Sequence, residues 1–324
     1  MQLPVDVKGL LDELTDINTA RETSVSVSVY VDEAAPVELV AHVRNAFASS
    51  SPHVRMTVTY LDDAFVPHPT DDVAVIVAGA NGRAGKSAEA LRAVGVPAMV
   101  VTLNPGEVAA AAVEAGAEIP DGDIISPLRE EVEVEIAFDS ETAAALDERM
   151  GRWIVSVCRA KRLAFAIAFP FMRRPLAKDI IQVTSLENAG VGLIPFVPGA
   201  DLPIMTLNQV KMVLQIAAAY GEEMCKDRIK ELAFVLAGAY VSRGLVRRLV
   251  AAVPVLGFVF KTGVAYGTTT AVGYAVIEYF EGGKDATGVA NVLERATEAG
   301  TKIAGAVQEK AAIVAPRLSE AFSE

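Results

Sequence analysis

The residues with the clearest chemical potential stand together in Ala80-Asn-Gly-Arg-Ala-Gly-Lys-Ser87, directly after an apolar run. In a phosphate-binding loop, backbone amides and the lysine hold the phosphates, and the serine hydroxyl binds Mg²⁺. Gly85, Lys86 and Ser87 match that pattern, whereas Ala80 replaces its first glycine. Only about two helical turns follow Ser87 before Gly95, and no acidic residue closes a later strand as a second metal ligand. We therefore expect a glycine-rich turn, with GTP or ATP binding and hydrolysis at Lys86 and Ser87 as the alternative.

Other residues that commonly carry chemistry are scattered. His42, His53 and His68 lack metal-ligand spacing, and Cys158 and Cys225 each stand alone in an apolar stretch. We therefore expect no metal site and no disulfide, which fits a reducing cytosol. The net charge of −12 and the lack of a long Lys/Arg run argue against nucleic-acid binding, which needs a basic surface. The first residues lack a charged segment followed by an apolar run, so we expect no secretory signal.

The first half of the chain alternates between predicted strands and predicted helices. Residues 24–31 and 55–61 alternate in polarity, and 24–31 is predicted to have one face less buried than the other. Residues 73–79 and 97–103 are continuous apolar runs, typical of strands covered on both faces. Helices are predicted over 36–47, with Leu39, Val43 and Phe47 facing inward, and over 87–94 and 106–116. Residues 130–138 carry Glu on one face, as suits an exposed edge strand. This order predicts a parallel, Rossmann-like sheet.

The second half is helical in pattern. One helix is predicted near the start of the chain, over 7–17. In the second half, one or two helices are predicted over 140–169, where Pro170 and Pro175 interrupt the pattern. Further helices are predicted over 176–190, 206–220, 226–250, 255–280 and 285–323. On 206–220 a single narrow stripe is polar, formed by Asn208, Lys211 and Gln215, so most of that helix should be buried. The fold class is therefore α/β plus all-α. We expect an α/β domain over 1–138, a helical bundle over 139–284 and an amphipathic C-terminal helix over 285–324.

A Pro/Gly-rich turn over 192–203 precedes the helix at 206–220. Pro198 and Gly199 are expected to shape this turn, and Asp201 is expected to cap the helix that comes after it. A ligand-binding role for Asp201 is the alternative. Gln209 and Lys211 are interpreted as an interhelical hydrogen bond and a solvated charge, so no catalytic residue is assigned.

Residues 71–126 resemble the second half of an Era-like GTPase. Asn104 matches the asparagine of the base-recognition motif, with Pro105 and Glu107 in place of its lysine and aspartate, and Ser126 matches the Ser-Ala loop. After the first strand, where the family has its phosphate loop, the chain reads DEAAPVE. The resemblance therefore implies a pseudo-GTPase without hydrolysis, in which a purine site around Asn104 stays an open alternative.

A second resemblance covers roughly 175–283. VPGADLPIMTLNQVKMVLQIAAAYG (197–221) and VPVLGFVFKTGVAYGTTTAVGYAVIEYFEGG (253–283) resemble the domain of unknown function 697. That family is a helical module found behind Era-like GTPase domains and in YcjF-type bacterial inner-membrane proteins. The resemblance implies association with the inner membrane or a protein partner, and no biochemical activity.

The apolar runs of the second half are short for a membrane span, which needs about 20 residues. Twelve uncharged residues separate Arg248 from Lys261, and sixteen separate Lys261 from Glu278. We therefore expect a cytoplasmic, non-catalytic binding or scaffold protein, with an integral hairpin over 232–280 as the alternative. Its expected partners are a protein or a membrane surface, and self-association is left open.

Overall fold

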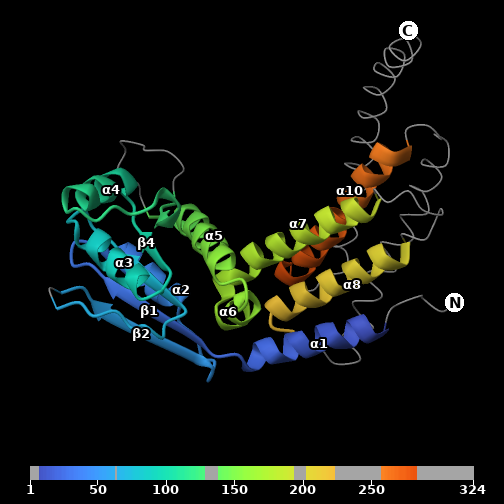
Figure 1. Ribbon diagram of the computed structural model, residues 1–324, viewed down its shortest axis with the longest axis horizontal. Helices are drawn as coiled ribbons and strands as arrows, with labels where there is room; N and C mark the ends of the chain where they lie inside the picture. The colour runs from blue at the N-terminus through green and yellow to red at the C-terminus, as the bar shows by residue number, and fades with distance from the viewer. Residues whose placement is uncertain (1–6, 63, 128–137, 193–201, 223–256, 283–324) are drawn as a thin grey trace, which may run out of the picture. The chain divides into compact units, whose positions relative to one another are not determined.

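The computed structural model describes residues 7–62, 64–127, 138–192, 202–222 and 257–282 (Figure 1). These residues belong to two compact units. The α/β unit comprises the described residues of 18–176, and the helical unit comprises residues 7–17 together with the described residues from Ala177 onward. The predicted elements 130–138, 226–250 and 285–323, and the turn residues Pro198, Gly199 and Asp201, lie outside the described residues.

A five-stranded sheet forms the centre of the α/β unit, and every pairing in it is parallel. Its order is β2-β1-β3-β4-β5. The strands are β1 (Val25–Val31), β2 (Val54–Tyr60), β3 (Val73–Val77), β4 (Ala98–Val101) and β5 (Ile124–Ile125). The parallel sheet and its first four strands are therefore confirmed.

Right-handed crossovers place the helices of this sheet on its two faces. The chain moves from β1 to β2 in one direction and from β3 through β4 to β5 in the other, so the helix after β1 and those after β3 and β4 lie on opposite faces. These helices are α2 (Val37–Ala46), α3 (Arg83–Ala93) and α4 (Pro105–Glu114). Figure 1 shows α3 in front of the strands. Leu39, Val43 and Phe47 are fully buried, which confirms the predicted inner side of α2.

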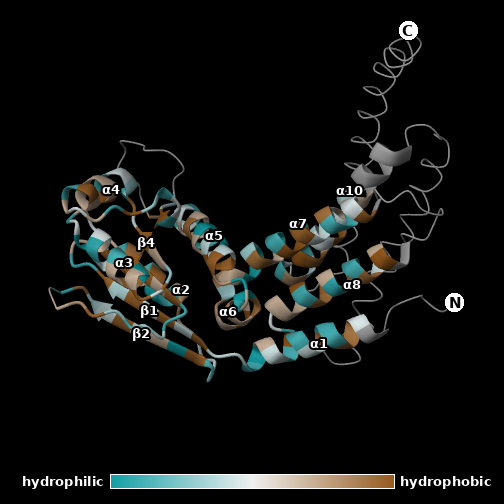
Figure 2. Ribbon diagram, viewed as in Figure 1, coloured by the Kyte–Doolittle hydropathy of each residue, from teal (hydrophilic) through white to brown (hydrophobic). Residues whose placement is uncertain are grey.

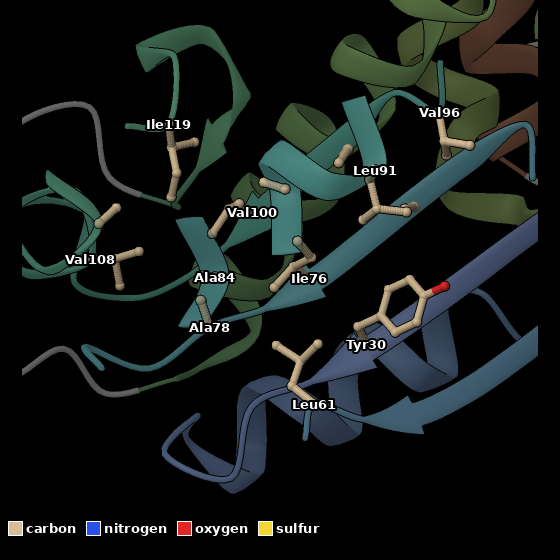
Figure 3. Packing of buried hydrophobic residues seen from close by; sticks show 14 residues of the cluster. Tyr30, Leu61, Ile76, Ala78, Ala84, Leu91, Val96, Val100, Val108 and Ile119 are labelled. Atoms are coloured by element: carbon tan, nitrogen blue, oxygen red, sulfur yellow. The ribbon is translucent and has the colours of Figure 1, made fainter. Parts of the chain in front are cut away.

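Between α3, α4 and the sheet lies a core of aliphatic side chains (Figure 3). Ile76 and Val100 come from the strands, Ala84 and Leu91 from α3, and Val108 from α4. Small alanines on both helices allow them to approach the sheet and each other closely.

The central position of β1 overturns one expectation. All of its residues except Ser26 are buried, so neither face is left open as the alternating pattern predicted. Ser28 is buried, and its hydroxyl is hydrogen-bonded to that of Thr57 on β2 at 2.7 Å. A serine whose hydroxyl bonds to the neighbouring strand can be buried. The alternation of serine and valine in the sequence therefore did not mark an exposed face.

Helices that come after the sheet also belong to the α/β unit. They are α5 (Ser140–Val157), α6 (Arg162–Ala168) and the short 3₁₀ helix η2 (Pro170–Met172). Trp153 Nε1 on α5 donates to Asp123 Oδ1 at 2.9 Å, and Lys161 Nζ lies 2.7 Å from Asp72 Oδ1. The unit consequently ends near residue 176, whereas the change in sequence pattern placed the boundary at 138.

The helical unit contains most of α1 (Val7–Glu22) and α7 (Arg173–Gly192), together with α8 (Leu202–Ala219) and α10 (Gly257–Glu281). Pro175 was expected to break a helix, but α7 runs through it. The reason is that Pro175 lies in the first turn, where the backbone N–H needs no helical partner. Figure 2 shows hydrophobic and hydrophilic residues alternating along α8. No helix among the described residues combines the length and apolar character that crossing a membrane requires.

A buried polar network joins three helices of this unit. Thr269 Oγ1 on α10 accepts hydrogen bonds from Asn188 Nδ2 on α7 and Gln209 Nε2 on α8, both at 2.9 Å. All three residues are essentially inaccessible to solvent. The interhelical hydrogen bond predicted for Gln209 is therefore confirmed.

The polar stripe of α8 meets α1 in the same unit. Gln215 Nε2 donates to Glu13 Oε1 at 2.6 Å, and Lys211 Nζ lies 3.9 Å from Glu13 Oε2. Lys211 was expected to be a solvated charge, but its side chain is 32% exposed and lies near this carboxylate. The remaining described surface of α8 is largely buried, as the narrow stripe predicted.

Candidate functional site

The carboxyl edge of the parallel sheet is the natural place for a site. The chain leaves β1 toward β2 on one side and leaves β3 toward β4 on the other. Ligands of open α/β sheets bind outside the carboxyl ends of the strands, at such a switch point. Here the switch lies between the ends of β1 and β3, so the residues directly after these strands define the candidate site.

Asp32 comes directly after β1 and is 1% exposed. Its amide donates to Val77 O of β3 at 2.9 Å, which holds it against the neighbouring strand. Oδ1 accepts from Ala34 N at 3.0 Å and from Asn81 Nδ2 at 2.6 Å. Oδ2 is also buried and has no hydrogen-bond partner among the described residues. A carboxylate with one saturated and one unpartnered oxygen is therefore enclosed at the switch point.

Asn81 links Asp32 to the start of α3. While its amide nitrogen donates to Asp32, its Oδ1 accepts from Arg83 N at 3.1 Å. Gly82 between them has φ +72°, a left-handed conformation that glycine adopts without strain. A Cβ on Gly79 would lie 2.5 Å from Ala34 atoms, so the loops after β1 and β3 are in close contact.

At the far side of the same edge, the loops after β4 and β5 are closed by local bonds. Thr102 Oγ1 accepts from Asn104 N at 3.1 Å, and Asn104 Nδ2 lies 3.4 Å from Glu107 Oε2. Ser126 is buried, and its carbonyl accepts a hydrogen bond from Arg149 of α5. Asn104 is exposed at the start of α4, and its amide nitrogen contacts Glu107 of the same helix.

The predicted phosphate residues lie inside α3 rather than in a loop before it. Since the helix begins at Arg83, Lys86 and Ser87 stand beyond its first turn, where backbone amides bond within the helix. Lys86 is exposed and Ser87 is buried. A Cβ on Gly85 would lie 2.2 Å from Ala117 O, which indicates that this glycine serves close packing near α4. This geometry argues against a phosphate loop at 80–87.

Acidic residues outnumber basic ones around the ends of β1 and β2. Glu33 comes after Asp32 and is exposed, and Asp62 lies just beyond the end of β2. Glu38 lies in the first turn of α2, which leaves the same edge. Positive charge comes from Arg83 and Lys86 on α3. These positions give the segments after β1 and β2 an acidic composition.

The opposite edge of the sheet holds a second polar cluster, and its bonds are internally complete. Asp72 accepts from Lys161 Nζ at 2.7 and 2.9 Å and from Ser26 N at 2.9 Å. Burial, together with the negative charge of Asp72, raises the pKa of Cys158 to about 12. A thiol with such a pKa is a poor nucleophile near neutral pH. This cluster anchors the start of α6 to the sheet.

One further pair joins two helices of the α/β unit. His42 Nε2 on α2 lies 2.7 Å from Asp147 Oδ1 on α5, and the imidazole packs edge-on against Phe138. No group of three His, Cys, Asp or Glu side chains within the described ranges is arranged to hold a metal ion. We therefore regard His42 and Asp147 as a structural contact.

Asp32, the central residue of this site, was not predicted from the sequence. The segment DEAAPVE stood out only for its missing Gly-Lys-Ser, and Asn81 only as part of a glycine-rich loop. A signal was present, because an aspartate that directly follows a strand in a parallel sheet lies at the carboxyl edge. The pairing of Asp32 with Asn81 could not be derived, since 49 positions separate the two residues.

Comparisons with known proteins add no relative. No family model, curated protein or solved structure matches the chain. The two resemblances in the sequence therefore stay predictions, and any functional proposal depends on the geometry of the chain itself.

Proposed function

We propose that the chain is a non-catalytic binding protein, in which a degenerate GTPase-like α/β unit is joined to a helical docking module. One observation carries the proposal: a buried carboxylate, Asp32, occupies the end of β1, where a GTPase would hold phosphates. A nucleotide would have to bring its negative charge close to this group.

The electrostatic penalty for such a ligand is large. Two like unit charges about 4 Å apart repel by about 4 kcal/mol at an effective dielectric constant of about 20. Each unit of phosphate charge would therefore weaken binding about a thousandfold at that distance. The hydrogen bonds from Asn81 and Ala34 hold the Asp32 side chain in place, so it cannot easily turn away.

Nearby groups give little compensation. Asn81 Oδ1 already accepts from the amide of Arg83 at the start of α3, and Lys86 and Ser87 lie beyond the first turn. A phosphate cradle needs several backbone amides directed at one point together with a lysine. The arrangement around Asp32 instead closes the loops after β1 and β3 onto each other.

Exposed apolar side chains support a docking role for the helical unit. Val183 and Leu186 stand three residues apart on α7 and are 41% and 57% exposed. Tyr266 and Tyr274 stand eight residues apart on α10, and both are exposed. Residues at these spacings share a helix face, and apolar side chains gathered on such a face suit a partner surface. The net charge of −12 opposes anionic lipid, so we favour a protein partner.

Isothermal titration calorimetry with Mg·GTP and Mg·ATP tests the proposal. We expect no saturable binding below about 1 mM, and no phosphate release above the buffer rate. The Lys86→Ala variant should match the wild-type chain in both assays. Micromolar binding with turnover that Lys86→Ala abolishes would establish the NTPase alternative instead.

Flotation with phosphatidylcholine and phosphatidylglycerol vesicles tests the docking surface. We expect the detergent-free chain to stay with the soluble fraction. Co-flotation that is lost in a Val183→Ser/Leu186→Ser variant would show that the α7 face binds lipid, contrary to our preference for a protein partner.

A further inference from the structure

We propose that the outer edge of β2 pairs with β2 of a second copy of the chain, which joins the two sheets edge to edge. The pairing is antiparallel, with a twofold axis at Thr57. Among the described residues, β2 stands at the end of the strand order and has β1 as its neighbour (Figure 1). The inference concerns a surface of the α/β unit and does not depend on the proposed function.

The outward backbone groups of β2 belong to its even-numbered residues. Leu61 N, just beyond the strand, donates to Val31 O of β1 at 2.8 Å, and the register of the two strands is uninterrupted. In a parallel ladder the N–H and C=O of one residue point to the same side, and the side alternates along the strand. Met56, Val58 and Tyr60 therefore direct both groups away from β1, where another strand can bond to them.

β2 lacks the features that usually keep an exposed strand edge from pairing. Its sequence, VRMTVTY, contains no proline or lysine, and its register contains no bulge. The one charge in the strand is held by its own chain, because Arg55 donates to Asp71 Oδ1 at 2.6 Å and to Thr70 Oγ1 at 3.2 Å. Val58 and Tyr60 are 39% and 60% exposed. A strand of this kind is a template for another strand.

A second copy suits this edge because β2 is complementary to itself about Thr57. Met56 comes to lie opposite the partner's Val58, and Val54 opposite the partner's Tyr60, so apolar side chains meet on one face of the joined sheet. Met56 and the partner's Val58 both direct their backbone groups outward, so this pair exchanges two hydrogen bonds. The twofold axis repeats each of these pairs on its other side.

Charge does not oppose the pairing within the strand. Arg55 lies opposite the partner's Thr59, and the two Arg55 side chains are separated by four strand positions, about 13 Å. That distance exceeds the Debye length of about 8 Å at physiological ionic strength. The net charge of −12 repels the two copies as a whole. We therefore expect a weak dimer, with a Kd of about 10–100 μM, which tightens as added salt screens the repulsion.

Sedimentation velocity of the full chain between about 1 and 500 μM tests for the dimer. Val58→Pro removes an outward N–H and no bond to β1, as edge strands tolerate, and it should weaken dimerisation by at least about 10-fold. Val58→Thr is the matched control, because it keeps the N–H and the branched side chain, and it should dimerise within about threefold of wild type. Melting temperatures of both variants report on their folding.

Disulfide cross-linking tests the register without the proline variant. Thr57 directs its backbone groups toward β1, so the two Thr57 residues form a non-hydrogen-bonded pair, with their Cα atoms about 4.5 Å apart. That separation is within the reach of a disulfide. In a Cys225→Ser background, Thr57→Cys should form a covalent dimer under mild oxidation. Thr59→Cys should not, because its two copies are about 13 Å apart.

Three results would each overturn the proposal. They are a chain that stays monomeric up to about 0.5 mM, a dimer that a folded Val58→Pro chain forms as well as wild type, and cross-linking of Thr59→Cys as ready as that of Thr57→Cys. A β2 edge that binds a strand of a different protein while the chain stays monomeric falls under the first of these results. No nucleotide is present in these experiments, so their outcome is separate from that of the GTP and ATP titrations.

Discussion

Replacing Thr269 by valine should destabilise the helical unit far more than the change in shape suggests. Valine has nearly the same volume as threonine, so the packing of α10 is preserved. What is lost is the single oxygen that accepts hydrogen bonds from both Asn188 and Gln209. The substitution therefore isolates the polar network from the surrounding apolar contacts.

The magnitude comes from two buried donors that lose their acceptor. Each buried group left without a partner costs about 1–3 kcal/mol. Asn188 Nδ2 keeps a long contact to Met205 O at 3.5 Å, which offsets part of the loss. We therefore expect Thr269→Val to lower the free energy of opening of this unit by about 2–4 kcal/mol.

Hydrogen exchange measured by mass spectrometry resolves the effect by segment. Peptides from α7, α8 and α10 should exchange about 30- to 1000-fold faster in Thr269→Val, while peptides from β1, β3 and β4 should be unchanged. Thr268→Val is the matched control, because the Thr268 hydroxyl donates within its own helix to Ala265 O. It should alter exchange little.

A second comparison separates lost hydrogen bonds from lost packing. When Asn188→Leu and Gln209→Leu are added to Thr269→Val, the unpaired donors are removed, and part of the stability should return. If Thr269→Val exchanges at the same rate as the wild-type chain or as Thr268→Val, the network contributes nothing measurable to stability. The expected loss of about 2–4 kcal/mol would then be wrong.

Three further predictions concern single positions. Gly273→Ala should destabilise the helical unit by about 1–3 kcal/mol, because the new Cβ would lie 2.3 Å from Ile181 Cγ1. Adding Ile181→Ala to Gly273→Ala should restore thermal stability, and failure to do so would place the clash elsewhere. In a Cys225→Ser background, Cys158 should react with a disulfide reagent at pH 8 about a thousandfold more slowly than an ordinary thiol. The reaction rate should still rise toward pH 12, because the pKa of Cys158 is raised to about 12. A plateau of the rate near pH 9 would contradict this. Asp139 accepts hydrogen bonds from the first-turn amides of α5, including that of Thr142, and these bonds lower the pKa of Asp139. The stabilisation by Asp139 should be complete above its pKa in the unfolded chain and lost as the pH falls through its pKa in the folded chain. The melting temperatures of wild type and Asp139→Ala should therefore converge in acid, and a difference that persists there would refute the capping role.

The periodicity of the sequence determined the elements and the class of the sheet. Strands 73–79 and 97–103 are apolar without interruption, and such runs are stable only under helices on both faces. The inner side of α2 could be predicted from the spacing of Leu39, Val43 and Phe47, because that spacing is a local property of a helix. The burial of much of α8 could be predicted from its narrow polar stripe for the same reason.

Tertiary structure alone decided which polar groups meet. Asp32 is paired with Asn81 because β1 and β3 are neighbours in the sheet, and Thr269 is paired with Asn188 and Gln209 because three helices converge. Local patterns carry no information on such pairings, since a hydrogen bond depends on distances between segments that are remote in the chain. The sequence pattern placed the start of this helix at residue 87, whereas α3 begins at Arg83, so Gly85, Lys86 and Ser87 lie within the helix.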